Sequence, residues 1–247
     1  MVMSGLKLEI CLVYLDDIIV FSKELPDHLQ RLKTIFERLR IAKLKLKLTK
    51  CKLLQQRVGF LAHVVSEAGI ATDPEKNKSV ETWPTPTSLK EVRSFLGLCS
   101  YYRRLVKGFS EIDSPLHRLA GKNVPFIWTP ECQQAFEELR LALTTTPVLT
   151  MPTDEDTYIL DADASHHTIG AVLSQVQAGK ERVIAYASRT YSKAEVNYCT
   201  TRQEFLAVVH FVKQFKQYLL GREFVIRTDH AALTWLQRTT DIIGQQA

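Results

Sequence analysis

The first twenty residues alternate between apolar runs and isolated charges. Residues 10–15 and 18–21 are apolar and predict two short strands that meet in a tight hairpin turn at Asp16 and Asp17. Adjacent negative charges repel each other, and burying either carboxylate without a partner is costly. The pair is therefore either a solvated hairpin turn or a set of ligands for a cation.

Helical and strand-like spacings follow. Leucine and phenylalanine at intervals of three and four over residues 29–39 predict a helix, with Asp27 and Gln30 as its capping box. Residues 43–48, "KLKLKL", alternate strictly and predict a strand with a leucine face and a lysine face. Residues 57–70 predict a hairpin that turns near Glu67 to Gly69.

A helical region is predicted in the middle of the chain. Asp73 is placed as the N-cap of a short helix, and Pro74 fits the first position of that helix. Ser88 and Glu91 form a capping box for a second helix. Helical signals continue through residues 130–143.

The pattern becomes rich in strands near Pro152. "TYILDAD", "GAVLSQ" and "RVIAYAS" predict three strands, and apolar residues at helical spacing from Phe205 to Leu219 predict a strong amphipathic helix. "EFVIRTD" predicts a further strand and "HAALTWL" a final helix. This order predicts a separate α/β domain, joined through residues 142–152 as a linker.

Composition narrows the class of protein. The 247 residues are 45% hydrophobic and carry a net charge of +5, which suits one large or two modest domains and is compatible with a nucleic-acid partner. Five scattered cysteines argue against a disulfide framework or a zinc site and favour an intracellular setting, in the cytoplasm or nucleus. No apolar run is long enough to span a membrane, and no sequence feature specifies an oligomeric state.

Charge is distributed unevenly. Ten Lys or Arg and one acidic residue lie between Leu29 and Gly59, which is typical of a surface for a polyanion. Within this run, Lys43, Lys45 and Lys47 are candidate contacts to nucleic acid, although such a face is more often a solvated strand.

Three carboxylates of the second domain lie at the edges of predicted elements. Asp163 ends a strand, Asp229 ends a later strand, and Glu204 lies in the first turn of the long helix. If they converge they repel one another unless they hold Mg²⁺, which prefers oxygen ligands and supports phosphodiester chemistry. Structural alternatives exist, since Glu204 follows Thr201 by three residues as in a capping box, and the aspartates could solvate strand ends. His166 is more readily a surface residue than a ligand.

Several segments, in order, resemble one family. "VYLDDIIVFS" resembles the Tyr-x-Asp-Asp hairpin of reverse transcriptases, in the form used by gypsy-class long-terminal-repeat retrotransposons. "VGFLAHVVSEAGI" is similar to the hairpin that grips the primer, and "DPEKNKSVETWPTPTSLKEVRSFLGLCSYYRRLVKGFS" to the thumb. "FIWTPECQQAFEELRLALTTTPVL" is similar to the connecting segment. "LDADASHHTIGAVLSQ", "IAYASRTYSKAEVNYCTTRQEFLAVV" and "IRTDHAALTWL" resemble the tethered ribonuclease H domain.

The resemblance implies an α/β protein with four parts. These are an α+β palm portion over residues 1–72, a helical thumb over 73–120, a connecting segment over 121–152 and a ribonuclease H-like mixed-sheet domain over 153–247.

It also implies the roles of particular residues. Asp16 and Asp17 would bind the polymerase Mg²⁺ ions, with Mn²⁺ as an alternative metal, and Asp163, Glu204 and Asp229 would be ribonuclease H carboxylates. The lysines of residues 43–47, with Arg103 and Arg104, would contact the backbone of an RNA–DNA hybrid or a primed template, independently of base sequence.

The departures from the family pattern are equally informative. In the family, the fingers and the first half of the palm, with another catalytic aspartate, precede the hairpin, whereas only Met1 to Glu9 precede it here. We therefore expect a chain cut from something longer, without polymerase activity of its own. The fourth ribonuclease H carboxylate and the last helix would lie beyond Ala247, with Asp241 a weak substitute, and Ala62 replaces the usual glycine of "FLGH".

Two hypotheses of different classes follow. The first is an enzyme, a reverse transcriptase–ribonuclease H piece with at most ribonuclease H activity. The second is a non-catalytic remnant that binds RNA–DNA duplexes or a partner through the thumb and the basic palm segment. Metal-dependent cleavage of an RNA–DNA hybrid distinguishes them.

Overall fold

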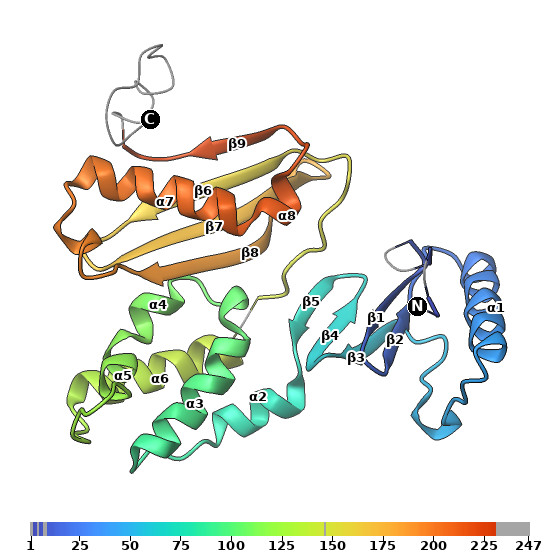
Figure 1. Cartoon of the computed structure of the whole chain (residues 1–247), viewed down its shortest axis with the longest axis horizontal. Helices are drawn as coiled ribbons and strands as arrows, with labels where there is room; N and C mark the ends of the chain where they lie inside the picture. Colours follow the sequence, from blue (N-terminus) through green and yellow to red (C-terminus); the bar gives the residue numbers. More distant parts are fainter. Residues whose placement is uncertain (1, 4, 7–8, 146, 231–247) are drawn as a thin grey trace. The chain divides into compact units, whose positions relative to one another are not determined.

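The chain folds as two units, Met1–Glu67 and Ala68–Ala247. A computed structural model describes residues 2–3, 5–6, 9–145 and 147–230 (Figure 1). The helix predicted for "HAALTWL" falls almost entirely outside these residues, as does Asp241. Within the described part of the chain, no helix is both long enough and apolar enough to cross a lipid bilayer.

The first unit contains the predicted hairpin. Strands β1 (Cys11–Tyr14) and β2 (Asp17–Val20) pair antiparallel with Tyr14 opposite Asp17, so Leu15 and Asp16 form a two-residue turn. Helix α1 (Leu25–Ile41) packs two buried residues, Ile35 and Leu39, against the hairpin around Cys11. This small apolar cluster is the core of the unit.

The predicted capping box of α1 is wrong. The helix begins one turn earlier, at Leu25, with Glu24 as an N-cap whose side chain makes no capping hydrogen bond. Pro26 lies in the first turn, where its missing N–H costs nothing. Asp27 is therefore inside the helix, and its carboxylate pairs with Arg31 four residues later at 2.8 Å.

The predicted strand over residues 43–48 is also wrong. Lys43 has a φ of 55°, a short 3-10 helix covers Leu48–Lys50, and the intervening residues form no strand. Leu44 and Leu46 are both about half exposed, at 54% and 44%. Alternation defines two faces, but a strand also needs a neighbour for its backbone hydrogen bonds, and among the described residues none pairs with this segment.

An unpredicted turn divides the next segment. Strands β3 (Arg57–Phe60) and β4 (His63–Ser66) pair antiparallel with Phe60 opposite His63. Leu61 and Ala62 form the two-residue loop, with φ values of 50° and 55°. Hairpins of this kind prefer Asn-Gly because both central residues need positive φ. Because neither Asn nor Gly stands at positions 61 and 62, the sequence did not predict this turn. The predicted turn near residue 67 is present as well, between β4 and β5 (Gly69–Thr72).

The second unit continues with helices whose starts were predicted correctly. Asp73 caps α2 (Pro74–Glu81) by accepting a hydrogen bond from the Glu75 N–H at 2.9 Å. Ser88 caps α3 (Leu89–Tyr101) by accepting from the Glu91 N–H at 3.4 Å. The Glu91 carboxylate accepts from the Thr87 N–H at 2.7 Å, so the reciprocal bond is one residue removed from the predicted box.

The helical part of the second unit forms an aromatic core. The remaining elements are η2 (Arg103–Leu105), α4 (Phe109–Ile112), α5 (Ser114–Leu119) and α6 (Pro130–Thr144). Phe95 of α3 and Phe136 of α6 are both buried, with ring centroids 4.7 Å apart. Each such side chain contributes about 1.5–3 kcal/mol through burial, which holds the short helices together.

A mixed sheet forms the rest of the second unit. Strands β6 (Tyr158–Ala164), β7 (Thr168–Gln177), β8 (Lys180–Thr190) and β9 (Phe224–Arg227) lie in the order β8-β7-β6-β9. The pairs β6–β7 and β7–β8 are antiparallel, and β6–β9 is parallel. Helix α7 (Thr200–Gln214) lies across one face of the sheet and is followed by α8 (Lys216–Leu219) (Figure 1). This is the predicted α/β class with a mixed sheet.

The apolar stripe predicted from Phe205 to Leu219 is confirmed in part, because Phe215 and Leu219 are buried in the core of the sheet domain. Within α7 itself the buried face differs. Glu204, Ala207 and Phe211 are its buried residues, whereas Phe205 and Val208 are only partly covered. Glu204 is thus one of the buried residues of α7, in its first turns, rather than a residue beside the apolar stripe.

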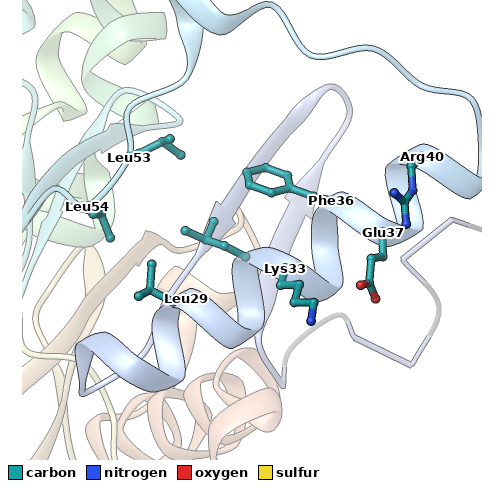
Figure 2. Close-up of a pocket in the computed structure, with 8 residues that line it drawn as sticks. Leu29, Lys33, Phe36, Glu37, Arg40, Leu53 and Leu54 are labelled. Atoms are coloured by element: carbon teal, nitrogen blue, oxygen red, sulfur yellow. The ribbon is translucent and has the colours of Figure 1, made fainter.

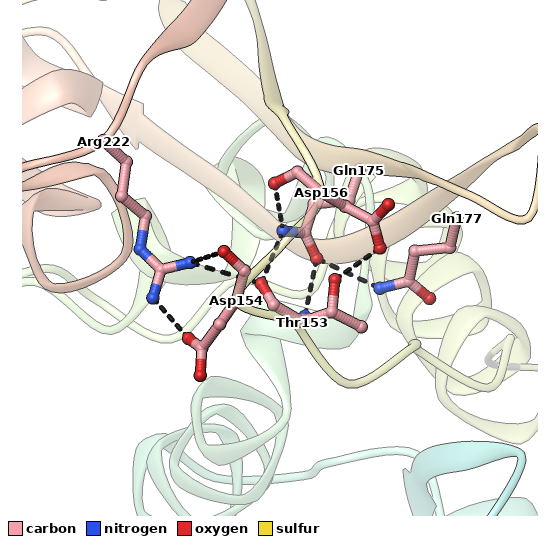
Figure 3. Close-up of polar contacts among 6 residues, drawn as sticks. All are labelled: Thr153, Asp154, Asp156, Gln175, Gln177 and Arg222. Atoms are coloured by element: carbon pink, nitrogen blue, oxygen red, sulfur yellow. Dashed lines mark hydrogen bonds and ion pairs between the residues drawn. The ribbon is translucent and has the colours of Figure 1, made fainter.

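The predicted linker is held in place by hydrogen bonds. Leu149 exchanges two backbone hydrogen bonds with Ile70, at 2.7 and 2.9 Å. The contact needs a glycine at position 69, because a Cβ there would lie 2.0 Å from the Leu149 carbonyl oxygen. Figure 3 shows how the next residues are tied to β7: Gln175, which is fully buried, accepts from the Thr153 N–H and donates to the Thr153 carbonyl, at 2.9 and 3.0 Å.

Candidate metal centre and nucleic-acid-binding residues

Three carboxylates meet at one edge of the sheet. Asp163 lies near the end of β6, Glu204 in the first turns of α7, and Asp229 two residues beyond β9. The parallel register places Asp161 opposite Arg227, so the two strands carry Asp163 and Asp229 to the same end. One oxygen atom from each of the three carboxylates lies within 4.8 Å of the others. No other such cluster of His, Cys, Asp and Glu was found among the described residues.

Glu204 is the buried member of the group. It is 5% exposed, while Asp163 and Asp229 are exposed. Burial and, to a smaller extent, the charges of Asp163 and Asp229 together raise the pKa of Glu204 to about 7, against the opposing effect of a hydrogen bond with the Ala164 backbone. Its Oε2 atom is buried and has no hydrogen-bond partner among the described residues. The centre therefore concentrates three acidic side chains at one edge of the sheet.

This donor set fits a hard divalent cation. Mg²⁺ and Mn²⁺ take carboxylate oxygens as ligands, and an ion would neutralise the repulsion that raises the pKa of Glu204. The unpartnered Oε2 of Glu204 is an independent sign of a missing ligand, because buried carboxylate oxygens are normally hydrogen-bonded. His166, by contrast, is not part of the cluster.

The fold argues against the structural alternatives for Glu204 and Asp163, whereas Asp229 does lie exposed just beyond the end of a strand. Helix α7 has Cys199 as its N-cap, and the Thr201 hydroxyl lies 2.9 Å from Nε2 of His230, so Glu204 belongs to no capping box with Thr201. Asp163 lies inside a strand rather than in a loop. The His230–Thr201 contact, next to Asp229, was not anticipated, although His230 follows Asp229 directly in the sequence.

The other predicted metal ligands lie in the first unit and are exposed. Asp16 is in the β1–β2 turn and Asp17 begins β2. Their neighbours Tyr14 and Leu15 are 55% and 85% exposed, so this end of the hairpin is solvated and does not bury the aspartates. Helix α1 packs against the hairpin together with Met3 and Leu6, and Leu15 has a φ of 49°, a strained value for a branched side chain. Among the described residues, no third metal-binding side chain joins this pair.

The predicted basic contacts fall into two groups. Lys43, Lys45 and Lys47 are exposed, although on an irregular segment rather than on a strand. Arg103 and Arg104 make internal contacts with the sheet region. Arg103 donates to the Ser188 carbonyl at 2.6 Å, and Arg104 donates to the Tyr218 hydroxyl at 2.7 Å. Arg103 thus bonds to strand β8 and Arg104 to helix α8, contacts between distant residues that the sequence could not reveal.

A groove of about 550 Å³ lies between α1 and the following segment in the first unit (Figure 2). Its walls are leucine and phenylalanine side chains, among them Leu29, Phe36 and Leu54, with Lys33 and Arg40 beside them. The groove is thus an apolar surface, chemically unlike the carboxylate centre of the second unit.

Comparison with known proteins identifies the family to which the chain belongs. Residues 2–65 match a model of the reverse transcriptase (RNA-dependent DNA polymerase) family, and residues 128–226 match a model of the RNase H-like domain found in reverse transcriptase. The Pol polyprotein of transposon 297 from Drosophila melanogaster is 41% identical over 228 residues, which cover 92% of this chain. The chain belongs to the Pol polyprotein family of retrotransposons.

Two further Pol polyproteins are similar in sequence to the chain. The gypsy polyprotein of Drosophila melanogaster is 36% identical over 240 residues, and the Tf2-3 polyprotein of Schizosaccharomyces pombe is 34% identical over 223 residues. The chain spans only 21%, 23% and 17% of the lengths of the 297, gypsy and Tf2-3 proteins.

Solved structures show the same fold. This Pol family member superimposes on a foamy viral protease-reverse transcriptase in complex with an RNA/DNA hybrid with a TM-score of 0.82, at 26% identity. The match covers 93% of this chain and 31% of the viral chain. A second structure of that viral protein, in complex with double-stranded DNA, has the same TM-score and identity, with 40% of the viral chain covered.

Proposed function

We propose that Asp163, Glu204 and Asp229 hold divalent metal and form a ribonuclease H centre that hydrolyses the RNA strand of an RNA–DNA hybrid. The observation that carries the proposal is their convergence within 4.8 Å, with the buried Oε2 of Glu204 left without a partner. The substrate class is supported by the viral reverse transcriptase of similar fold, which was solved with such a hybrid.

The exposed and the buried carboxylates of the centre would have different roles. Asp163 and Asp229 are exposed and accessible to a phosphodiester, whereas Glu204 is buried. When bound, Mg²⁺ supplies an activated water and stabilises the leaving oxygen. The three side chains would fix the position of that charge, and the mixed sheet would keep the carboxylates in place.

The palm residues have a separate proposed role. Asp16 and Asp17 would serve as the polymerase carboxylates of the Tyr-x-Asp-Asp hairpin, and a primed template would be the nucleic acid that they act on. Since the pair is exposed and joined by no third ligand among the described residues, this chain by itself is proposed not to polymerise DNA. Primer extension on a primed RNA template, with Mg²⁺ or Mn²⁺, tests this. Template-dependent extension that is lost in Asp16→Asn would overturn it.

The alternative is a non-catalytic nucleic-acid-binding remnant. The observation in its favour is the exposed basic segment of the first unit, which needs no metal to attract a phosphate backbone. An intracellular setting is common to both proposals and is supported by the five cysteines, all of which are free.

Two measurements test the ribonuclease H proposal. The first is cleavage of an RNA–DNA hybrid by the parent, Asp163→Asn and Asp229→Asn, with Mg²⁺ and with Mn²⁺. The second is thermal melting of the same proteins, because a metal that binds only the folded state stabilises it by about 1.4 kcal/mol at ten times its Kd. Both aspartate variants should lose cleavage and most of the metal-induced rise in Tm.

Glu155→Gln is the matched control, because Glu155 is an exposed carboxylate outside the cluster. It should keep both cleavage and the metal response of the parent. If neither metal raises the Tm of the parent more than that of the aspartate variants, the three carboxylates form no metal site and the remnant hypothesis stands.

A further inference from the structure

Tyr191 lies at the edge of the core between the sheet and α7. Its side chain is 9% exposed and belongs to the same apolar cluster as Ala207 and Phe211 of the helix. It directly follows Thr190, the last residue of β8, and its N–H donates to the His167 carbonyl at 3.1 Å. The ring therefore occupies the layer that also contains Glu204.

The pairing of the strands places Tyr191 at the carboxylate end of the sheet. Thr190 of β8 lies opposite Thr168 of β7, and the next residue of β7, Ile169, lies opposite Ala164 of β6. Asp163 is thus only two strands away, at the same edge.

The hydroxyl group of Tyr191 is unusual. It is buried, and it has no hydrogen-bond partner among the described residues. The Oε2 atom of Glu204 is in the same condition. Each buried polar atom left unpaired costs about 1–3 kcal/mol, and two of them in one layer, near one acidic cluster, call for a common explanation. The charges of Glu204 and Asp163 contribute to the raised pKa of Tyr191, which agrees with their proximity.

We propose that Tyr191 is a positioning residue of the metal centre, whose phenol O–H donates a hydrogen bond to a water bound by the divalent cation. The inference rests on the ribonuclease H function proposed above. Mg²⁺ characteristically keeps several of its waters when it binds protein carboxylates, so an outer hydrogen-bond donor has a defined target. Such outer-shell donors typically change metal affinity by about 10–100-fold.

Tyr191→Phe separates this role from a merely structural one. The substitution keeps the ring and removes only the hydroxyl. Without metal, the variant should melt at the same temperature as the parent or higher, because an unpaired buried hydroxyl has gone. With metal, its affinity for Mn²⁺, followed by electron paramagnetic resonance titration, should fall by roughly tenfold, and its Mg²⁺-induced rise in Tm should shrink.

Tyr186→Phe is the matched control, because Tyr186 is a second partly buried phenol on β8. It should leave the metal affinity unchanged. If Tyr191→Phe binds Mn²⁺ as tightly as the parent while Asp163→Asn does not, the role of Tyr191 is refuted and the metal centre stands. If the parent itself binds neither metal, both proposals fail.

Discussion

Arg227 of β9 donates two parallel hydrogen bonds to the carboxylate of Asp161 of β6, from Nε to Oδ1 at 2.5 Å and from Nη2 to Oδ2 at 2.6 Å. The two residues are also register partners in the parallel pair. The guanidinium continues to Glu181 of β8, at 3.0 and 2.7 Å, and Glu181 accepts from Ser174 of β7 at 2.9 Å. One arginine thus ties together side chains from all four strands, two residues before Asp229 and opposite the strand that carries Asp163.

Arg227→Met should weaken the metal centre more than it weakens the fold. The side chains of the pair are 47% and 35% exposed, so the loss in unfolding free energy should be only about 1 kcal/mol. The register of the edge strand β9 should loosen, however, and the Mg²⁺-induced rise in Tm should fall well below that of the parent.

Arg222→Met is the control for this prediction, because Arg222 pairs with Asp154 away from the carboxylate cluster (Figure 3). It should retain the parental metal response. An Arg227→Met protein that responds to Mg²⁺ as the parent does would show that the register does not depend on the arginine.

Ala62→Gly should stabilise the first unit. Ala62 has a φ of 55° in the β3–β4 turn, a left-handed conformation that costs a residue with a Cβ about 1–2 kcal/mol. Glycine removes this strain but adds freedom to the unfolded chain, which returns about 0.4–1 kcal/mol. The net gain in unfolding free energy, measured by urea titration, should be on the order of 0.5–1 kcal/mol.

Ala42→Gly is the control, because Ala42 follows α1 with an ordinary φ of −76°. It should gain nothing, since only the entropy cost applies there. Equal stabilisation by both changes would mean that strain in the turn is not relieved.

Asp113 should make stability depend on pH between about 4 and 6. Burial raises its pKa from 3.8 to about 6, against the opposing charges of His117 and Arg103. The folded state therefore holds a proton that the unfolded state has released, so the contribution to stability is complete below pH 3.8 and is lost as the pH rises to 6. The full loss is on the order of 3 kcal/mol.

Asp113→Asn removes this titration. Its unfolding free energy relative to the parent should increase from pH 4 to pH 6 and then level off, as measured by denaturant unfolding at each pH. Glu155→Gln, which changes an exposed carboxylate, should follow the parent at every pH. A constant difference between Asp113→Asn and the parent would exclude a buried titrating carboxyl at this position.

The exposed lysines of the first unit should contribute to nucleic-acid binding through charge alone. Changing Lys43, Lys45 and Lys47 together to Gln should weaken binding to an RNA–DNA hybrid and reduce the slope of log K against log salt by roughly 2–3. Fluorescence anisotropy at several salt concentrations measures both quantities.

A second triple variant provides the control for the lysines. Lys180, Lys193 and Lys216 are exposed and lie in the sheet domain, outside the N-terminal basic segment. Changing them to Gln removes the same charge and should affect the slope less. If the two triple variants behave alike, only net charge matters and the N-terminal segment is not a binding surface.

Local signals in the sequence were sufficient for much of the fold. The β1–β2 hairpin around Asp16, the caps at Asp73 and Ser88, and the strands and helix of the second unit all follow from periodicity and capping chemistry, which act between near neighbours. The same reasoning placed Asp163, Glu204 and Asp229 at the ends or starts of elements. The β3–β4 turn is the exception among hairpins of sequence neighbours, because Leu61 and Ala62 carry no turn signal although both have positive φ.

Tertiary structure decided the features that depend on distant partners. The "KLKLKL" segment has the pattern of a strand but no strand beside it, and Arg103 bonds to Ser188, 85 residues away. Glu204 is buried against the sheet in the first turns of α7, and only the packing of this helix on the sheet brings it to Asp163 and Asp229. The unpaired hydroxyl of Tyr191 likewise has no signature in the sequence, since hydrogen bonding in a core is a property of three-dimensional neighbours.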